Sequence, residues 1–153
     1  VFLMPIKEIK EFHIIDTIEK PNETPRVLLE NKSLKKQIEV SGKVLEAQYR
    51  IGESFLVLVT EGNPFEEALY VYYFSNSLHL MDSLELSAMY SEGMLRNVSL
   101  SDSGDIMFSF FDNDEQWVLK VYSQPKYDFF NNKYPVKRKM PVFHKNWLSL
   151  KKS

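Results

Sequence analysis

The sequence contains no cysteine, only five glycines and no apolar run long enough to cross a membrane. Without cysteine, a disulfide framework, a thiolate metal site and a cysteine nucleophile are all excluded. The glycines stand singly, so no glycine-rich loop is available to hold a phosphate. The longest apolar stretch is Phe55–Val59, whereas a spanning helix needs about 20 residues. No signal-peptide pattern opens the chain, and we expect a cytoplasmic protein that does not contact a membrane.

Positive charge is scarce in the middle of the chain. Residues 44–123 contain thirteen acidic and three basic residues, a net charge of −10. Residues 124–153 contain eight basic residues and one acidic residue, a net charge of +7. The formal total of −2 conceals this segregation. Either the two segments contact each other, or one of them meets a charged partner.

The composition is nevertheless that of a folded protein. Of the 153 residues, 44% are hydrophobic and 14% are aromatic, which is enough apolar material for one well-formed core. We interpret residues 1–153 as a single domain. It comprises an acidic β-meander core at 44–123 and a basic, proline-containing C-terminal arm at 124–153.

Short apolar and alternating segments at about ten-residue spacing, separated by turn-forming residues, predict an antiparallel meander. We therefore expect a mainly β fold, forming a curved sheet or half-open barrel with at most one or two short helices. Residues 26–36 fit either a short helix or a strand and a loop, and residues 142–144 and 147–150 either dock a final strand or form an arm. The other expected strands are 12–18, 37–40, 45–51, 55–60, 69–74, 78–86, 95–100, 105–111 and 116–122.

Catalytic patterns are weak. His13, His79 and His144 have no metal-ligand spacing, although two histidines and a lysine can cleave RNA by acid–base catalysis. The run Asp112-Asn113-Asp114 lacks the glycine and glutamate that complete a calcium loop. A pair of carboxylates flanking a cleft would suit a small hydrolase. We expect no enzyme activity, no metal and no cofactor, and keep the hydrolase as a third hypothesis.

Carboxylates gather at two predicted turns, in Thr60–Glu67 and in Asp112–Glu115. Aspartate and asparagine often stabilise turns by bonding their own backbone, which is the simplest explanation. The scarcity of lysine and arginine around them favours a different interpretation. Carboxylates at several hairpin tips would form an acidic recognition surface on one rim of the protein.

The chain resembles, in its general character, the immunity proteins of bacterial polymorphic toxin and contact-dependent growth inhibition systems. The stretches that carry this resemblance are Thr60–Tyr70, Leu78–Leu86 and Phe108–Asp114. The resemblance implies a protein that binds and neutralises a cognate toxin, commonly a basic nuclease domain, with carboxylates in place of phosphates. Opposite charge would steer the encounter, and buried aromatic anchors would supply affinity. The partner-binding residues expected on this basis are Glu61, Glu66, Glu67, Tyr72, Tyr90, Asp112, Asp114, Glu115 and Trp117.

The basic arm supports an alternative function. Positive charge interleaved with stacking aromatic rings is how proteins hold single-stranded nucleic acid without reading its sequence. The same arm could instead pack back onto the acidic sheet. The residues concerned are Lys133, Tyr134, Lys137, Arg138, Lys139, Phe143, Lys145, Trp147, Lys151 and Lys152.

Overall fold

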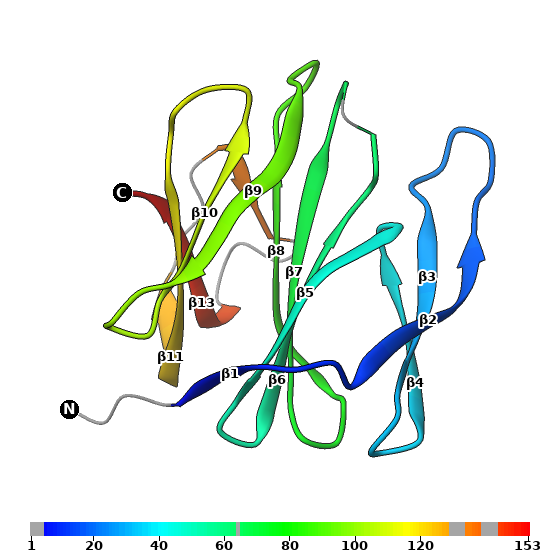
Figure 1. The fold of residues 1–153 in the computed structure, drawn as a ribbon, viewed down its shortest axis with the longest axis vertical. Helices are drawn as coiled ribbons and strands as arrows, with labels where there is room; N and C mark the ends of the chain where they lie inside the picture. Colours follow the sequence, from blue (N-terminus) through cyan, green and yellow to red (C-terminus); the bar gives the residue numbers. More distant parts are fainter. Residues whose placement is uncertain (1–4, 64, 129–133, 139–143) are drawn as a thin grey trace.

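The structure is a computed structural model that describes residues 5–63, 65–128, 134–138 and 144–153. Within these residues the chain forms thirteen strands, arranged in three antiparallel sheets (Figure 1). The predicted mainly β, antiparallel class is therefore confirmed, and none of the three sheets closes into a barrel. The described part of the chain includes no helix with the length and apolar character that a membrane span requires.

The central layer is a six-stranded sheet in the order β1-β5-β6-β7-β8-β12. Strands β6 and β7 are buried along almost their whole length because both faces of this sheet are covered. This burial explains why their sequences are continuously apolar rather than alternating. The strands are β1 (Ile6–Glu8), β5 (Val44–Ile51), β6 (Ser54–Thr60), β7 (Ala68–Phe74), β8 (Leu80–Ser87) and β12 (Val136–Lys137).

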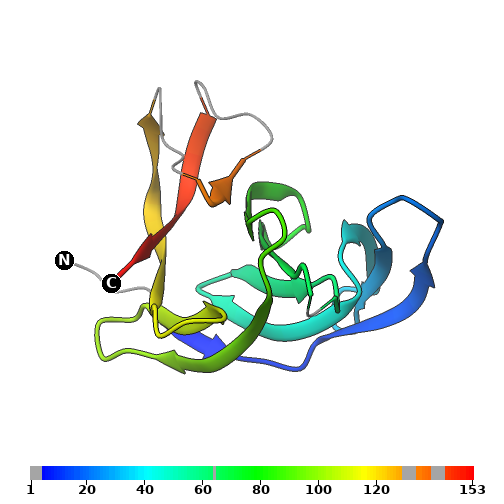
Figure 2. The same ribbon diagram turned by 90° about the horizontal axis from the view of Figure 1, so that it is seen from above.

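A four-stranded sheet in the order β13-β11-β10-β9 covers one face of the central layer (Figure 2). The main core lies between these two sheets, where Leu58 and Val71 cluster with Phe108, Leu119 and Leu148. The strands are β9 (Gly93–Leu100), β10 (Ile106–Phe111), β11 (Trp117–Asp128) and β13 (His144–Lys152).

A three-stranded sheet in the order β2-β3-β4 covers part of the opposite face. Its strands are β2 (Phe12–Ile18), β3 (Arg26–Asn31) and β4 (Lys36–Ser41), so residues 26–36 form a strand and a turn rather than a helix. Val27 and Leu29 pack against Val57 and Val59 in a second core. At the end of β4 the sheets approach so closely that a Cβ atom on Gly42 would overlap Val59.

The basic arm packs onto the acidic sheet. Strand β13 pairs with β11, and the short β12 pairs with β8. The buried carboxylate of Asp82 accepts hydrogen bonds from the Arg138 guanidinium (3.1 Å) and from the Trp147 and Leu148 amides (both 2.9 Å). Residues 142 and 143 of the predicted final strand lie outside the described residues.

Two further ion pairs join the segments of opposite charge. The Nζ of Lys137 lies 3.7 Å from Glu85, and the Nζ of Lys152 lies 3.0 Å from Glu115. Part of the charge segregation in the sequence is thus balanced inside the molecule.

Candidate functional site

Three hairpin loops meet at one end of the molecule, the upper end in Figure 1. The Tyr90 amide in the β8–β9 loop donates to Glu66 in the β6–β7 loop at 3.2 Å. The Asp112 amide in the β10–β11 loop donates to the Glu92 carbonyl at 3.3 Å. The Met89 amide also donates to the Tyr134 hydroxyl at 3.3 Å. These bonds hold segments far apart in sequence against one another.

The exposed residues of this end form a mixed acidic and apolar surface, which we call the acidic rim. Its most exposed aromatic ring belongs to Tyr90, at 84%. A hollow of about 470 Å³ opens between Tyr90, Tyr134 and the Asp112 loop. None of the rim carboxylates has an ion pair with any described residue. The acidic rim comprises Phe65, Glu66, Met89, Tyr90, Glu92, Asp112, Asp114 and Tyr134.

Four of the nine residues expected to bind a partner lie on the acidic rim, namely Glu66, Tyr90, Asp112 and Asp114. Glu115 lines the same hollow and is half-buried, with its carboxylate paired to Lys152. The rim also contains Phe65, Met89, Glu92 and Tyr134, which the sequence did not single out as partner-binding residues. These four residues share an exposed side chain next to a turn. Their exposure follows from how the loops are placed in the structure, so the sequence alone does not reveal it.

Three of the expected residues lie in the interior. The carboxylate of Glu67 is buried and accepts the Gly62 and Ala68 amides at 3.0 Å, which closes the β6–β7 turn. Tyr72 is buried in the second core and donates its hydroxyl to the Ser41 carbonyl at 2.9 Å. Trp117 is 2% exposed and packs edge-on against Phe111.

Glu61, the last of the nine, is half-buried at the start of the β6–β7 loop. The Tyr70 hydroxyl donates to its carboxylate at 2.5 Å. Burial raises the pKa of Glu61, and repulsion from Glu67, Glu85 and Glu66 adds to the rise, while the Tyr70 hydrogen bond opposes it. Burial and the Glu61 carboxylate raise the pKa of Tyr70 well above its ordinary value. Tyr70 is therefore a neutral donor that anchors Glu61, not a nucleophile.

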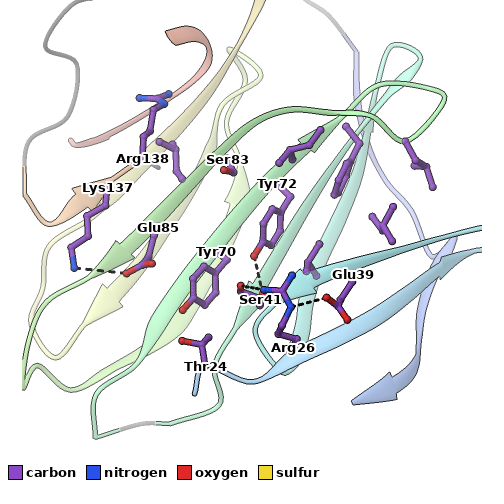
Figure 3. A pocket seen from close by; sticks show the side chains of 16 residues that line it. Thr24, Arg26, Glu39, Ser41, Tyr70, Tyr72, Ser83, Glu85, Lys137 and Arg138 are labelled. Carbon is purple, nitrogen blue, oxygen red and sulfur yellow. Dashed lines mark hydrogen bonds and ion pairs between the residues drawn. The ribbon is translucent and has the colours of Figure 1, made fainter. Parts of the chain in front are cut away.

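A second hollow of about 460 Å³ separates β4 from β8 (Figure 3). We call it the β4–β8 groove. Its floor is a ladder of stacked rings on one face of β7, with centroids 6.3 Å apart for Tyr70 and Tyr72 and 6.1 Å for Tyr72 and Phe74. The period of two in this ladder was the sequence signal that could have revealed it.

The walls of the β4–β8 groove carry charges that are already paired. On the β4 side, Arg26 Nε donates to Glu39 at 2.8 Å. On the β8 side, Lys137 pairs with Glu85, and Arg138 with the buried Asp82. The groove therefore presents an apolar floor between two neutralised walls.

The catalytic and metal candidates are dispersed. His13 lies on β2 beside Glu30 (3.5 Å), His79 lies in the β7–β8 turn, and His144 begins β13. Among the described residues no group of three histidine, aspartate or glutamate side chains could hold a metal ion. In the β10–β11 loop, the Asn113 side chain accepts the Glu115 amide at 3.0 Å, as expected of a turn-forming residue.

The aromatic residues of the basic arm differ in their exposure. Trp147 packs against Tyr73 with ring centroids 6.0 Å apart, beside the main core. Tyr134 is 68% exposed but belongs to the acidic rim. Lys145, Lys151 and Lys152 are exposed, whereas Lys133, Lys139 and Phe143 lie outside the described residues.

Comparison with known proteins found no family model, no curated protein and no solved structure that matches this chain.

Proposed function

We propose that this protein is an immunity-type inhibitor that binds a basic toxin domain through the acidic rim and catalyses no reaction itself. The observation that carries the proposal is the composition of the rim. Four carboxylates that form no ion pair with any residue of the described part of the chain stand beside exposed Tyr90, Phe65 and Met89. Elsewhere the protein pairs Glu85 and Glu115 with lysines of the arm.

The physics of association supports this arrangement. Unpaired carboxylates raise the rate at which a basic partner arrives and disfavour acidic partners. Exposed aromatic and methionine side chains are the residue types that lose most water-accessible area in a protein interface and supply most of its affinity. A surface that combines both is suited to protein partners rather than to a small substrate.

The test begins by identifying the partner. Tagged protein is used to capture partners from native cells, and each captured protein is then expressed alone and with this chain. We expect a captured protein that is basic, that inhibits growth when expressed alone, and that is tolerated when this chain is co-expressed. If no captured protein inhibits growth, the inhibitor proposal is refuted.

A matched pair of charge reversals then locates the interface. Glu66→Lys with Asp112→Lys alters the acidic rim, whereas Glu53→Lys with Asp102→Lys makes the same charge change at exposed turns of the opposite end. We expect the rim variant to weaken binding by about 100-fold and abolish protection, because like charges meet across the interface. The control variant should protect like the wild type. Equal protection by both variants would exclude the rim.

A further inference from the structure

The β4–β8 groove runs beside a free strand edge. In the β3–β4 pair, which has no register shift, the Gly42 amide donates to the Pro25 carbonyl at 2.8 Å. Hydrogen-bonded and non-hydrogen-bonded pairs alternate along an antiparallel ladder. Val40 therefore bonds to β3, whereas Glu39 and Ser41 direct their N–H and C=O groups away from it.

This outward edge faces the groove. The Ser41 carbonyl already accepts the Tyr72 hydroxyl from β7 (2.9 Å), and Lys36 Nζ reaches the Ser77 carbonyl in the β7–β8 turn (3.5 Å). Between these two contacts, the N–H and C=O of Glu39 have no hydrogen-bond partner among the described residues. Glu39 and its neighbour Val40 both line the groove.

The other edge strands are poorer templates for a ligand. β2, β9 and β13 carry register shifts against their neighbours, and Asn97 within β9 has a positive φ of 55°. β1 and β12 have three and two residues. β4 is regular over six residues and borders a hollow. Proteins usually protect such an edge, because it can pair with another chain.

The side chains of the groove set the character of a ligand. At one end, Leu78, Leu80 and Ile38 adjoin Phe74 and form an apolar lining, in which Leu80 is 54% exposed. The flanking charges are all paired, so a charged ligand would find no free counter-ion on the walls. An uncharged ligand with an apolar side chain matches this lining.

We propose that the β4–β8 groove binds an extended, uncharged peptide segment of another protein, which adds to β4 as a fourth strand. Backbone bonds to Glu39 would supply affinity, and the apolar end would select a leucine-like side chain. The edge from Gln37 to Ser41 spans about 13 Å, which matches four or five residues of strand. The site is separate from the acidic rim and does not depend on the inhibitor function.

The probe is the acetylated and amidated peptide Thr-Leu-Thr-Leu-Thr, titrated into the full chain and followed by NMR. We expect shift changes centred on β4 and β7, and slower hydrogen exchange of the Glu39 amide. Two N-methylated isomers are compared, one modified on the two leucines and one on the inner and the C-terminal threonines. Alternate amides of a strand point to opposite sides, so one methylation pattern should weaken binding by about tenfold more than the other.

Variants of β4 isolate the backbone contribution. Glu39→Pro removes the outward amide at an edge position where proline is tolerated, and Glu39→Ala keeps it. We expect Glu39→Pro to bind the peptide about tenfold more weakly than Glu39→Ala, because one carbonyl of the peptide loses its donor. Leu80→Ser should also weaken binding by about tenfold through lost apolar contact. Because the Leu80 side chain is exposed, replacing it by serine should leave the fold intact. The test therefore stays decisive if the proline variant unfolds.

Several results would overturn the proposal. Absence of any shift on β4, equal binding of both methylated isomers, or equal binding by both Glu39 variants would exclude strand addition. Side-chain binding without a backbone role would assign the groove to a small molecule. A wild-type dimer that Glu39→Pro converts to a monomer in sedimentation would assign it to a second copy. The rim variant Glu66→Lys with Asp112→Lys should bind the peptide like the wild type, which separates this proposal from the inhibitor function.

Discussion

Glu61 and Tyr70 show how one buried contact fixes the chemistry of a loop. Glu61 lies among other carboxylates, and the Tyr70 hydroxyl donates to its carboxylate at 2.5 Å. Because burial raises the pKa of Glu61, the folded state holds a proton there more tightly than the unfolded state does. Ionised Glu61 therefore costs stability, and the cost grows as pH rises above 4.5, its unperturbed value.

Replacing Glu61 by glutamine should stabilise the protein at pH 7. Glutamine still accepts the Tyr70 hydrogen bond but cannot ionise, so it avoids the cost of a buried charge. The advantage should shrink as pH falls through 4.5, where the wild-type carboxyl is also neutral. Urea unfolding of both proteins at pH 7 and pH 4 measures it, with Glu53→Gln at an exposed turn as the control. A variant that is less stable at pH 7, or an advantage independent of pH, would contradict this account.

At the scale of elements, one buried carboxylate contacts two segments of the arm. Asp82 on β8 receives bonds from Arg138 and from two amides of β13, so it joins strands of two different sheets. Both side chains of the ion pair are almost wholly buried, at 0% and 4% exposure for Asp82 and Arg138. The free-energy cost of removing both charges from water is offset only while the pair is intact.

Asp82→Ala should destabilise the protein by about 3–5 kcal/mol, because it leaves the buried Arg138 without that charge partner. Glu85→Ala, which breaks the neighbouring exposed pair with Lys137, should cost about 1 kcal/mol or less. Denaturant unfolding of the two variants measures the contrast. Similar losses for both would mean that the Asp82 contacts do not hold the arm.

The positions of many strands were predictable from the sequence, but the assignment of each strand to a sheet was not. Alternation and turn residues placed the strands from β5 to β10 close to their observed ranges, whereas β11 runs to Asp128, six residues beyond the predicted end at 122. The same patterns do not say which sheet a strand joins, since a period of two fits any sheet. Asp82 shares its phase with the buried Leu84 and Leu86, and this alternation indicates that it faces the interior. Glu67 is acidic and beside a turn like Glu66, and the Gly62 and Ala68 amides that its carboxylate accepts hold it inward.

At the scale of the whole molecule, strand β13 of the basic arm is part of the core. Leu148 and Leu150 of β13 are 1% and 7% exposed and pack in the main core. The arm is thus not a free tail, and any role in nucleic-acid binding must be tested by substitution rather than truncation.

Deleting residues 144–153 should abolish cooperative unfolding. Each buried leucine contributes about 2–5 kcal/mol, and the total stability of a domain is only about 5–15 kcal/mol. Replacing Lys145, Lys151 and Lys152 by glutamine should cost about 1 kcal/mol or less, because all three are exposed. Thermal unfolding followed by near-ultraviolet circular dichroism compares the two proteins. A deletion that still melts cooperatively would place the core elsewhere.

The doubly covered central sheet has a consequence for biosynthesis. Its strands from β5 to β8 leave the ribosome before the residues of β13 that complete the cover on one face. Leu86 and Leu150 are separated by about 60 residues, or roughly 3–13 s of translation at ordinary rates. During that interval the cover over the face that carries Leu58 and Val71 is incomplete. The nascent chain is therefore most prone to aggregation before β13 is synthesised, and slow translation of the segment between β8 and β13 would lengthen that exposure.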